Sequence, residues 1–175
     1  MADAVTIVAG LPIPSSSPVF LAGVGLHVLF GLAAVASGAA AMLSRKGPRR
    51  HPRFGRTYVW CLAGLAATAA ALASVRWRED AVLLALAVAA FAAAFVGRRA
   101  RQRLWPGWPS WHIVGMGGSY IVMLTAFYVD NGPNLPVWRS LPSAAYWTAP
   151  ALVGLPILIW ALTRHPVVRA ARSAA

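Results

Sequence analysis

Five long apolar stretches, separated by short polar or basic segments, dominate the pattern of this 175-residue chain. Each is close to the roughly 20 apolar residues that a helix needs to cross the hydrocarbon core of a bilayer. The pattern therefore predicts an all-α, polytopic membrane protein with five transmembrane helices in a bundle. The expected spans are residues 19–43, 57–75, 81–97, 111–129 and 144–163, between an outer N-terminal tail (1–18) and a basic cytoplasmic tail (164–175).

Composition agrees with a membrane protein, since 59% of the residues are hydrophobic and only 11% are charged. A soluble domain would carry about a quarter charged residues. The net charge of +12 raises the question of nucleic acid. However, the basic residues lie in the gaps between apolar runs and form no amphipathic face, so we predict no nucleic-acid partner. The N-terminus lacks the basic region of a signal peptide, so we expect the first span to remain in the protein.

The segment RKGPRRHPRFGR, residues 45–56, sets the expected orientation. We expect Pro48 and Pro52 to keep it from continuing the first helix. Short loops rich in Lys and Arg stay in the cytoplasm, so the N-terminus is expected outside and the C-terminus inside. With this orientation, the inner segments hold all basic residues except Arg76, Arg78 and Arg139, and all four acidic residues lie outside.

Local signals mark where the helices should begin. Ser17 followed by Pro18 fits an N-cap and a first-turn proline, and we expect Ser110 and Ser143 to cap the fourth and fifth spans. Pro156 within the fifth span predicts a kink. Tryptophan and tyrosine side chains flank both expected boundaries, as in other membrane proteins.

His27 is the only ionisable residue deep within an expected span. Gly23 and Gly31 lie four residues to either side, and Ala34 and Gly38 continue the same stripe. One interpretation is a small-residue helix interface, with a neutral His27 hydrogen-bonded to a neighbouring helix. The other is that the glycines make room for a flat cofactor, with His27 as an axial ligand to haem iron.

The fourth span carries a second group of candidate ligands. His112, Met116 and Tyr120 follow one another at steps of four and so share one helix face. Histidine and methionine bind haem iron and copper, but both are also packing residues. His27 and His112 are expected on opposite sides of the membrane midplane, roughly 18 Å apart along the normal, too far to share one iron. His51 and His112, with His165, are instead expected to converge at the inner interface.

The motif HPRFGRTY predicts contacts at the level of the lipid head groups. Arg53, Arg56 and Tyr58 are the expected lipid or anion contacts, because anionic lipids attract basic juxtamembrane segments. A more specific interpretation is a site for an anion or a quinone head group, built from His51, Arg56 and Tyr58.

These motifs together resemble an uncharacterised family of bacterial predicted membrane proteins, the domain-of-unknown-function 2306 type. The resemblance covers residues 26–123, and its fourth-span motif fits an H-x3-M-x2-SY pattern. Where that family is usually more basic after this histidine, the present chain has apolar residues and a glycine. The resemblance implies a small helical membrane bundle and no established activity. The matching pieces are His27 with Gly31, HPRFGRTYVW (51–60) and HIVGMGGSYI (112–121), the last containing Met116, Ser119 and Tyr120.

Three functions follow as hypotheses. The first is a non-enzymatic accessory or binding subunit of the bacterial inner (plasma) membrane, in contact with anionic lipids and with other membrane subunits or further copies of itself. The second is a redox protein that holds haem b, or a copper or zinc ion, through His51 and His112. The third is a small transporter or proton carrier. The chain contains no CxxC, HExxH or paired-carboxylate motif that would indicate an enzyme.

Overall fold

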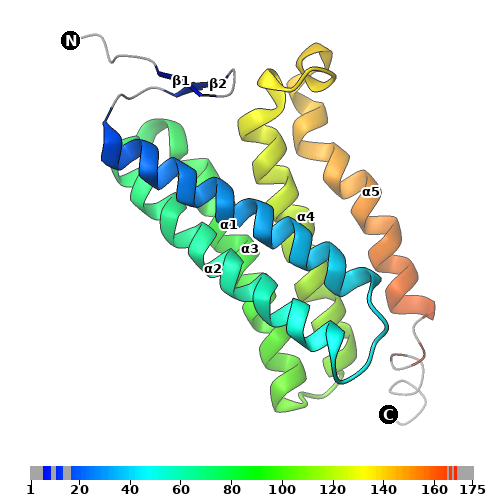
Figure 1. Cartoon of the computed structure of the whole chain (residues 1–175). Helices are drawn as coiled ribbons and strands as arrows, with labels where there is room; N and C mark the ends of the chain where they lie inside the picture. The colour runs from blue at the N-terminus through cyan, green and yellow to red at the C-terminus, as the bar shows by residue number, and fades with distance from the viewer. Residues whose placement is uncertain (1–5, 9–10, 14–16, 165, 167, 169–175) are drawn as a thin grey trace. The chain divides into compact units, whose positions relative to one another are not determined.

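The computed structural model describes residues 6–8, 11–13, 17–164, 166 and 168 (Figure 1). Within these residues, five helices are long and apolar enough to cross a membrane, which confirms the helical part of the prediction. A short antiparallel hairpin, β1 (Thr6–Val8) and β2 (Leu11–Ile13), precedes them. The helices are α1 (Pro18–Leu43), α2 (Arg50–Val75), α3 (Trp77–Arg103), α4 (Trp108–Asn131) and α5 (Ser143–Arg164), with two 3-10 turns, η1 (Gly132–Asn134) and η2 (Trp138–Ser140), between the last two.

The chain forms two compact units, Met1–Leu84 and Ala85–Ala175, and the boundary between them falls within α3. The expected outer tail and cytoplasmic tail lie largely outside the described residues, and so does His165.

The first unit is built on an antiparallel pair of helices, α1 and α2. Gly23 of α1 lies against Leu72 near the end of α2, and Gly31 lies against Leu65. A Cβ added to Gly64 would come within 2.7 Å of the ring of Phe30, so the ring occupies the space that this glycine leaves open. Small residues at such a seam let two helices approach closely, so that van der Waals packing can hold them together. The buried face of α1 consists of Ala34, Ser37, Gly38 and Ala41.

The second unit joins α4 to α5 and to the C-terminal part of α3. Gly117 and Gly154 give the α4–α5 seam its close fit, since each faces a branched side chain of the other helix, Leu158 and Ile121 respectively. At the α3–α4 crossing, a Cβ added to Gly115 would lie 2.6 Å from both the carbonyl oxygen of Ala93 and the Cα of Gly97. The backbones of α3 and α4 are therefore in direct contact at this crossing.

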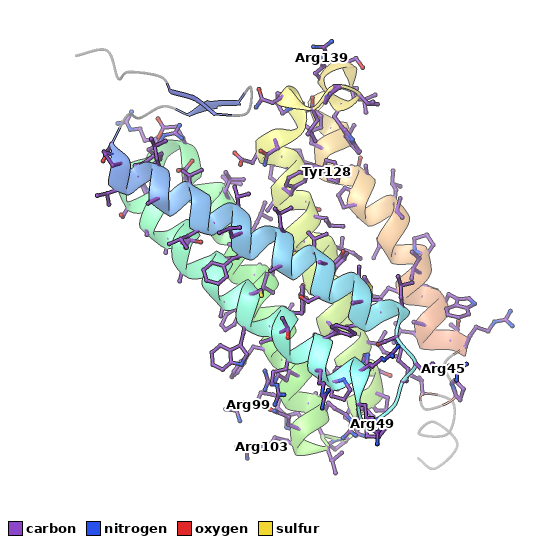
Figure 2. The ribbon with its side chains drawn as sticks, in the orientation of Figure 1. Arg45, Arg49, Arg99, Arg103, Tyr128 and Arg139 are labelled. Atoms are coloured by element: carbon purple, nitrogen blue, oxygen red, sulfur yellow. The ribbon has the colours of Figure 1, made fainter. Side chains whose placement is uncertain are left out.

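The segment between α4 and α5 is organised by Tyr146. Its hydroxyl donates to the carbonyl oxygens of Trp138 (3.1 Å) and Leu141 (3.3 Å), and its ring packs over Gly132. The ring of Trp138 also stacks on Tyr128, with centroids 4.1 Å apart. Figure 2 places Tyr128 and Arg139 at this end of the second unit, and Arg99 and Arg103 at the C-terminal end of α3.

Helix α2 begins seven residues before residue 57, the expected start of the second span. It starts at Arg50, so only residues 44–49 form the connection, and the expected basic loop continues as the first two turns of a helix. Pro52 is the third residue of that helix. The first four N–H groups of a helix have no intrahelical acceptor, so a proline there removes no backbone hydrogen bond. Helix α1 ends at Leu43, so the basic segment does not continue the first helix, as expected. The sequence did not predict that Pro52 would lie in the first turn of the second helix.

The other predicted helix starts are confirmed only in part. Pro18 is the first residue of α1, as expected, but Ser17 makes no side-chain capping hydrogen bond. Helix α4 begins at Trp108, after Gly107 in a left-handed conformation, so Ser110 lies inside its first turn and is not the cap. Ser143 is the first residue of α5, which contains Pro150 as well as Pro156.

Candidate functional site at the α1–α2 turn

The connection between α1 and α2 gathers cationic side chains around the last carbonyl groups of α1. The Ala41 carbonyl accepts hydrogen bonds from Ser44 Oγ (3.0 Å), Lys46 Nζ (3.2 Å) and His51 Nδ1 (2.9 Å). Lys46 Nζ also donates to the Met42 carbonyl at 2.7 Å. The C-terminal carbonyls of a helix carry partial negative charge and need partners. Side chains from the turn and from α2 therefore neutralise this helix end.

Because a carbonyl oxygen only accepts, Nδ1 of His51 must carry its proton in this contact. Burial also lowers the pKa of Lys46, since desolvation penalises its charged form. The role of His51 seen here is thus structural: it links the first turn of α2 to the last turn of α1.

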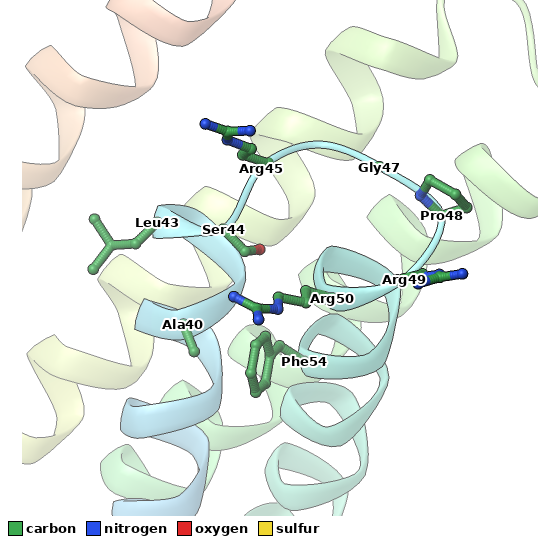
Figure 3. A pocket seen from close by; sticks show the side chains of 9 residues that line it. All are labelled: Ala40, Leu43, Ser44, Arg45, Gly47, Pro48, Arg49, Arg50 and Phe54. Atoms are coloured by element: carbon green, nitrogen blue, oxygen red, sulfur yellow. The ribbon is translucent and has the colours of Figure 1, made fainter.

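Beside this helix end lies a pocket with a volume of about 870 Å³ (Figure 3). The guanidinium group of Arg50 reaches from the first turn of α2 toward the end of α1, above the ring of Phe54, while Arg45 and Arg49 extend from the rim. Within the described part of the chain, none of these three arginines has a carboxylate at ion-pair distance; the ion pair found there joins Arg76 to Asp80. The lining residues are Ala40, Leu43, Ser44, Arg45, Gly47, Pro48, Arg49, Arg50 and Phe54.

The pocket is therefore apolar on the side formed by the helices and cationic at its rim. Leu43, at the end of α1 and close to four basic residues, is 89% exposed. Among the exposed arginines nearby, Arg53 and Arg56 lie further along α2 and do not line this pocket. Tyr58 differs from these two arginines in that it is buried, with only 2% of its surface exposed. The predicted contact of Arg53, Arg56 and Tyr58 with lipid or an anion stays a prediction.

His27 lies in the first unit, far from His51. Its Nδ1 is 3.0 Å from the Thr68 hydroxyl oxygen, and that hydroxyl in turn donates to the carbonyls of Gly64 and Leu65. This hydrogen bond to a neighbouring helix is the one that the packing interpretation of His27 expects. Thr68 and His51 are separated by seventeen residues of α2, about 25 Å of helix, so His27 and His51 cannot bind one group together.

His112 lies in the second unit, at the close crossing of α3 and α4. Its Nδ1 donates to the Gly97 carbonyl at 3.1 Å, across the Gly97–Gly115 contact. Met116 follows on the same face, and a Cβ on Gly97 would lie 3.0 Å from the Met116 backbone nitrogen. Tyr120 continues this face and is half-buried, whereas Ser119 is fully buried.

The predicted convergence of His51 with His112 joins residues of different units and stays a prediction. Among the residues that the structure describes, no three His, Cys, Asp or Glu side chains are grouped so that they could hold a metal ion. Of the three histidines that the structure describes, His51 supports a helix end, His112 a helix crossing and His27 the contact between α1 and α2. Haem b or a copper or zinc ion as a cofactor remains a hypothesis from the sequence.

Sequence reasoning missed the pocket and the capping role of Lys46. The pocket depends on α2 starting at Arg50, which places Arg50 and His51 opposite the end of α1. The role of Lys46 depends on α1 ending at Leu43. A signal was present in the run Ser44–Arg50, because a serine, a lysine and a glycine directly after an apolar helix are typical of a helix C-terminus.

Comparisons with known proteins do not assign a family to this chain. No protein-family model, no curated protein and no solved structure matches the chain. The class of protein therefore follows from the helices and their surfaces alone.

Proposed function

We propose that this chain is a multi-pass protein of the bacterial inner membrane and serves there as a non-enzymatic binding or accessory subunit, with the α1–α2 turn on the cytoplasmic side. The observation that carries the proposal is the exposure of large apolar side chains along helices long enough to cross a bilayer. Leu29 and Leu32 of α1 and Leu152, Val153 and Trp160 of α5 are each more than 60% exposed. Monomeric soluble proteins rarely expose continuous apolar faces of this size.

The polar groups within the helices support a binding role over a catalytic one. Thr68 and Ser37 donate to backbone carbonyls of their own helices, and His27 bonds to Thr68. Thr125 and Ser119 do the same in α4. Within hydrocarbon, the bonds to a residue's own helix satisfy its hydroxyl group, and the His27–Thr68 bond joins α1 to α2. These residues therefore have structural roles that need no transported ion or reacting substrate.

The distribution of charge supports the orientation. The α1–α2 turn and the C-terminal end of α3 are rich in arginine, while Glu79 and Asp80 lie in the first turn of α3, at its other end. Lys and Arg near the ends of spans resist translocation, so the arginine-rich ends are the expected cytoplasmic ones.

Labelling of single cysteines tests both insertion and orientation. The lone Cys61 is first replaced by alanine, and Gly47→Cys and Asn134→Cys are made separately. Both positions are accessible, since a Cβ on Gly47 meets nothing within 4 Å and Asn134 is exposed. In spheroplasts, a membrane-impermeant maleimide should label Asn134→Cys at once and Gly47→Cys only after the membrane is permeabilised. Immediate labelling of Gly47→Cys would refute the orientation.

The subunit role is tested by purifying the tagged full-length chain from its own membrane in mild detergent. We expect a stoichiometric partner chain, or a defined oligomer of this chain, to elute with it. A monomer that elutes alone at every detergent concentration would contradict the accessory role, while leaving the labelling result unaffected.

A further inference from the structure

We propose that the pocket at the α1–α2 turn is a binding site for a phosphate group, carried by an anionic phospholipid or present as a soluble anion. Three features of the described residues carry this inference: the cationic rim, the neutralised end of α1 and the apolar wall. The lipid source rests on the proposed membrane location, whereas the phosphate chemistry does not.

The rim supplies the charge and the geometry for a phosphate. Arg50 points from the first turn of α2 toward the end of α1, and Arg45 and Arg49 extend outward from the connection at the rim (Figure 3). No carboxylate within the described residues pairs with these three arginines. A guanidinium group offers a planar fork of N–H donors that matches two phosphate oxygens. The uncapped first turn of α2, where Arg49 at the N-cap makes no side-chain hydrogen bond, adds backbone N–H groups and a partial positive charge.

The end of α1 would normally repel an anion, because its last carbonyls carry partial negative charge. Here Lys46, Ser44 and His51 donate to the Ala41 carbonyl, and Lys46 donates to that of Met42 as well. These contacts cover the carbonyls that face the turn. The C-terminus of α1 and the N-terminus of α2 can therefore lie side by side around one anion.

The apolar wall favours a phosphate that is attached to hydrocarbon. Ala40, Leu43 and Phe54 line the pocket on the side of the helices, and Leu43 and Phe54 are exposed. A phospholipid can place its phosphate at the arginine rim and its chains along these side chains. Basic pockets at the cytoplasmic ends of membrane helices bind lipid head groups in this way.

The test compares two variants that each lose three positive charges. Arg45→Gln, Arg49→Gln and Arg50→Gln together remove the rim, and Arg98→Gln, Arg99→Gln and Arg103→Gln together serve as the matched control at the end of α3. Native mass spectrometry of the full-length detergent-solubilised chain measures binding of phosphatidylglycerol, phosphatidylcholine and inorganic phosphate. Thermal unfolding of each variant checks that it is folded.

We expect wild type and control to bind phosphatidylglycerol with affinities within about twofold of each other, and the rim variant to bind about tenfold more weakly. Phosphatidylcholine should bind more weakly than phosphatidylglycerol to wild type if lipid is the source. If wild type binds inorganic phosphate and the rim variant does not, the site is supported and its ligand is a soluble anion. Equal binding of every ligand by the rim variant and the control would overturn the proposal.

An unfolded rim variant would be replaced by Arg50→Gln alone, for which we expect a loss of at least threefold and for which no loss refutes the site. The binding test is made in detergent, so it does not depend on orientation. A labelling result that placed Gly47 outside would refute the proposed orientation. The phosphate site would still be tested separately, by the comparison of ligand binding between the rim variant and the control.

Discussion

Adding a single methyl group at Gly115 should separate α3 from α4. In Gly115→Ala the new Cβ would stand 2.6 Å from the Ala93 carbonyl oxygen and from the Cα of Gly97, and 2.8 Å from the Gly97 nitrogen. All three are backbone atoms of a helix, so no side chain can rotate away. Ordinary contact begins near 3.4 Å, so the helices must move apart by roughly 1 Å at this point.

This displacement determines how much the free energy of unfolding falls in Gly115→Ala. A gap of 0.5–1 Å already forfeits about a quarter to a half of the dispersion energy between the facing atoms, and overpacking of this kind costs about 1–3 kcal/mol. The 3.1 Å hydrogen bond from His112 to the Gly97 carbonyl would also be stretched beyond bonding distance. Alanine forms helices better than glycine by up to about 1 kcal/mol, which opposes the loss.

Gly118→Ala is the control for this gain in helix propensity, because it makes the same replacement in the same helix. Gly118 lies three residues further along α4, and a Cβ there meets nothing within 4 Å. The difference between the two variants is therefore the overpacking, about 1–3 kcal/mol, together with any loss of the His112 hydrogen bond. Each kcal/mol corresponds to about 2–4 °C in unfolding temperature. Thermal unfolding in one detergent, followed by the fluorescence of the 8 tryptophans, measures it. If Gly115→Ala unfolds at the same temperature as Gly118→Ala, the close crossing is not as described.

Three further predictions concern the other contacts. Thr68→Val removes the hydroxyl that bonds to His27 and should lower the free energy of unfolding by about 0.6–1.7 kcal/mol, as measured by thermal unfolding, whereas the exposed Thr163→Val should not. Because burial lowers the pKa of Lys46 below 10.5, the unfolded chain binds more protons than the folded chain just below that pH. The free energy of unfolding in denaturant should therefore rise with pH in that window in wild type and rise less in Lys46→Met. The absorption spectrum of the purified chain should show no Soret band, since the described histidines serve helix contacts; a Soret band would establish the haem hypothesis instead.

The positions of the helices could be predicted because hydropathy is a local signal that persists over about twenty residues. Their ends could not be predicted equally well. Whether Pro52 stops a helix or sits in its first turn depends on where that helix begins, which the proline does not determine. The same applies to Ser110, which lies inside α4 because the helix starts after a left-handed Gly107.

The candidate site was predictable only in part. The stripe of small residues around His27 indicated a helix interface, but the partner Thr68 is 41 residues away in sequence and depends on the register between α1 and α2. Likewise, the spacing of His112 and Met116 gave their shared face, but only the packed helices show that Gly97 and Gly115 meet there. Contacts between helices are set by the packing of two surfaces, so one helix pattern alone cannot give them.

The charge at the α1–α2 turn links ligand binding to the stability of this helix pair. Arg45, Lys46, Arg49 and Arg50 repel one another within one short connection, and within the described chain no carboxylate lies close enough to pair with the three arginines. A bound phosphate would relieve this repulsion more strongly while α1 and α2 remain packed, because only the folded turn holds the arginines at the rim of a pocket with an apolar wall. Such preferential binding raises the free energy of unfolding by about 1.4 kcal/mol when the ligand is present at ten times its dissociation constant. The turn should therefore gain stability from anionic lipid, and a chain purified without lipid should unfold at a lower temperature than one with phosphatidylglycerol restored.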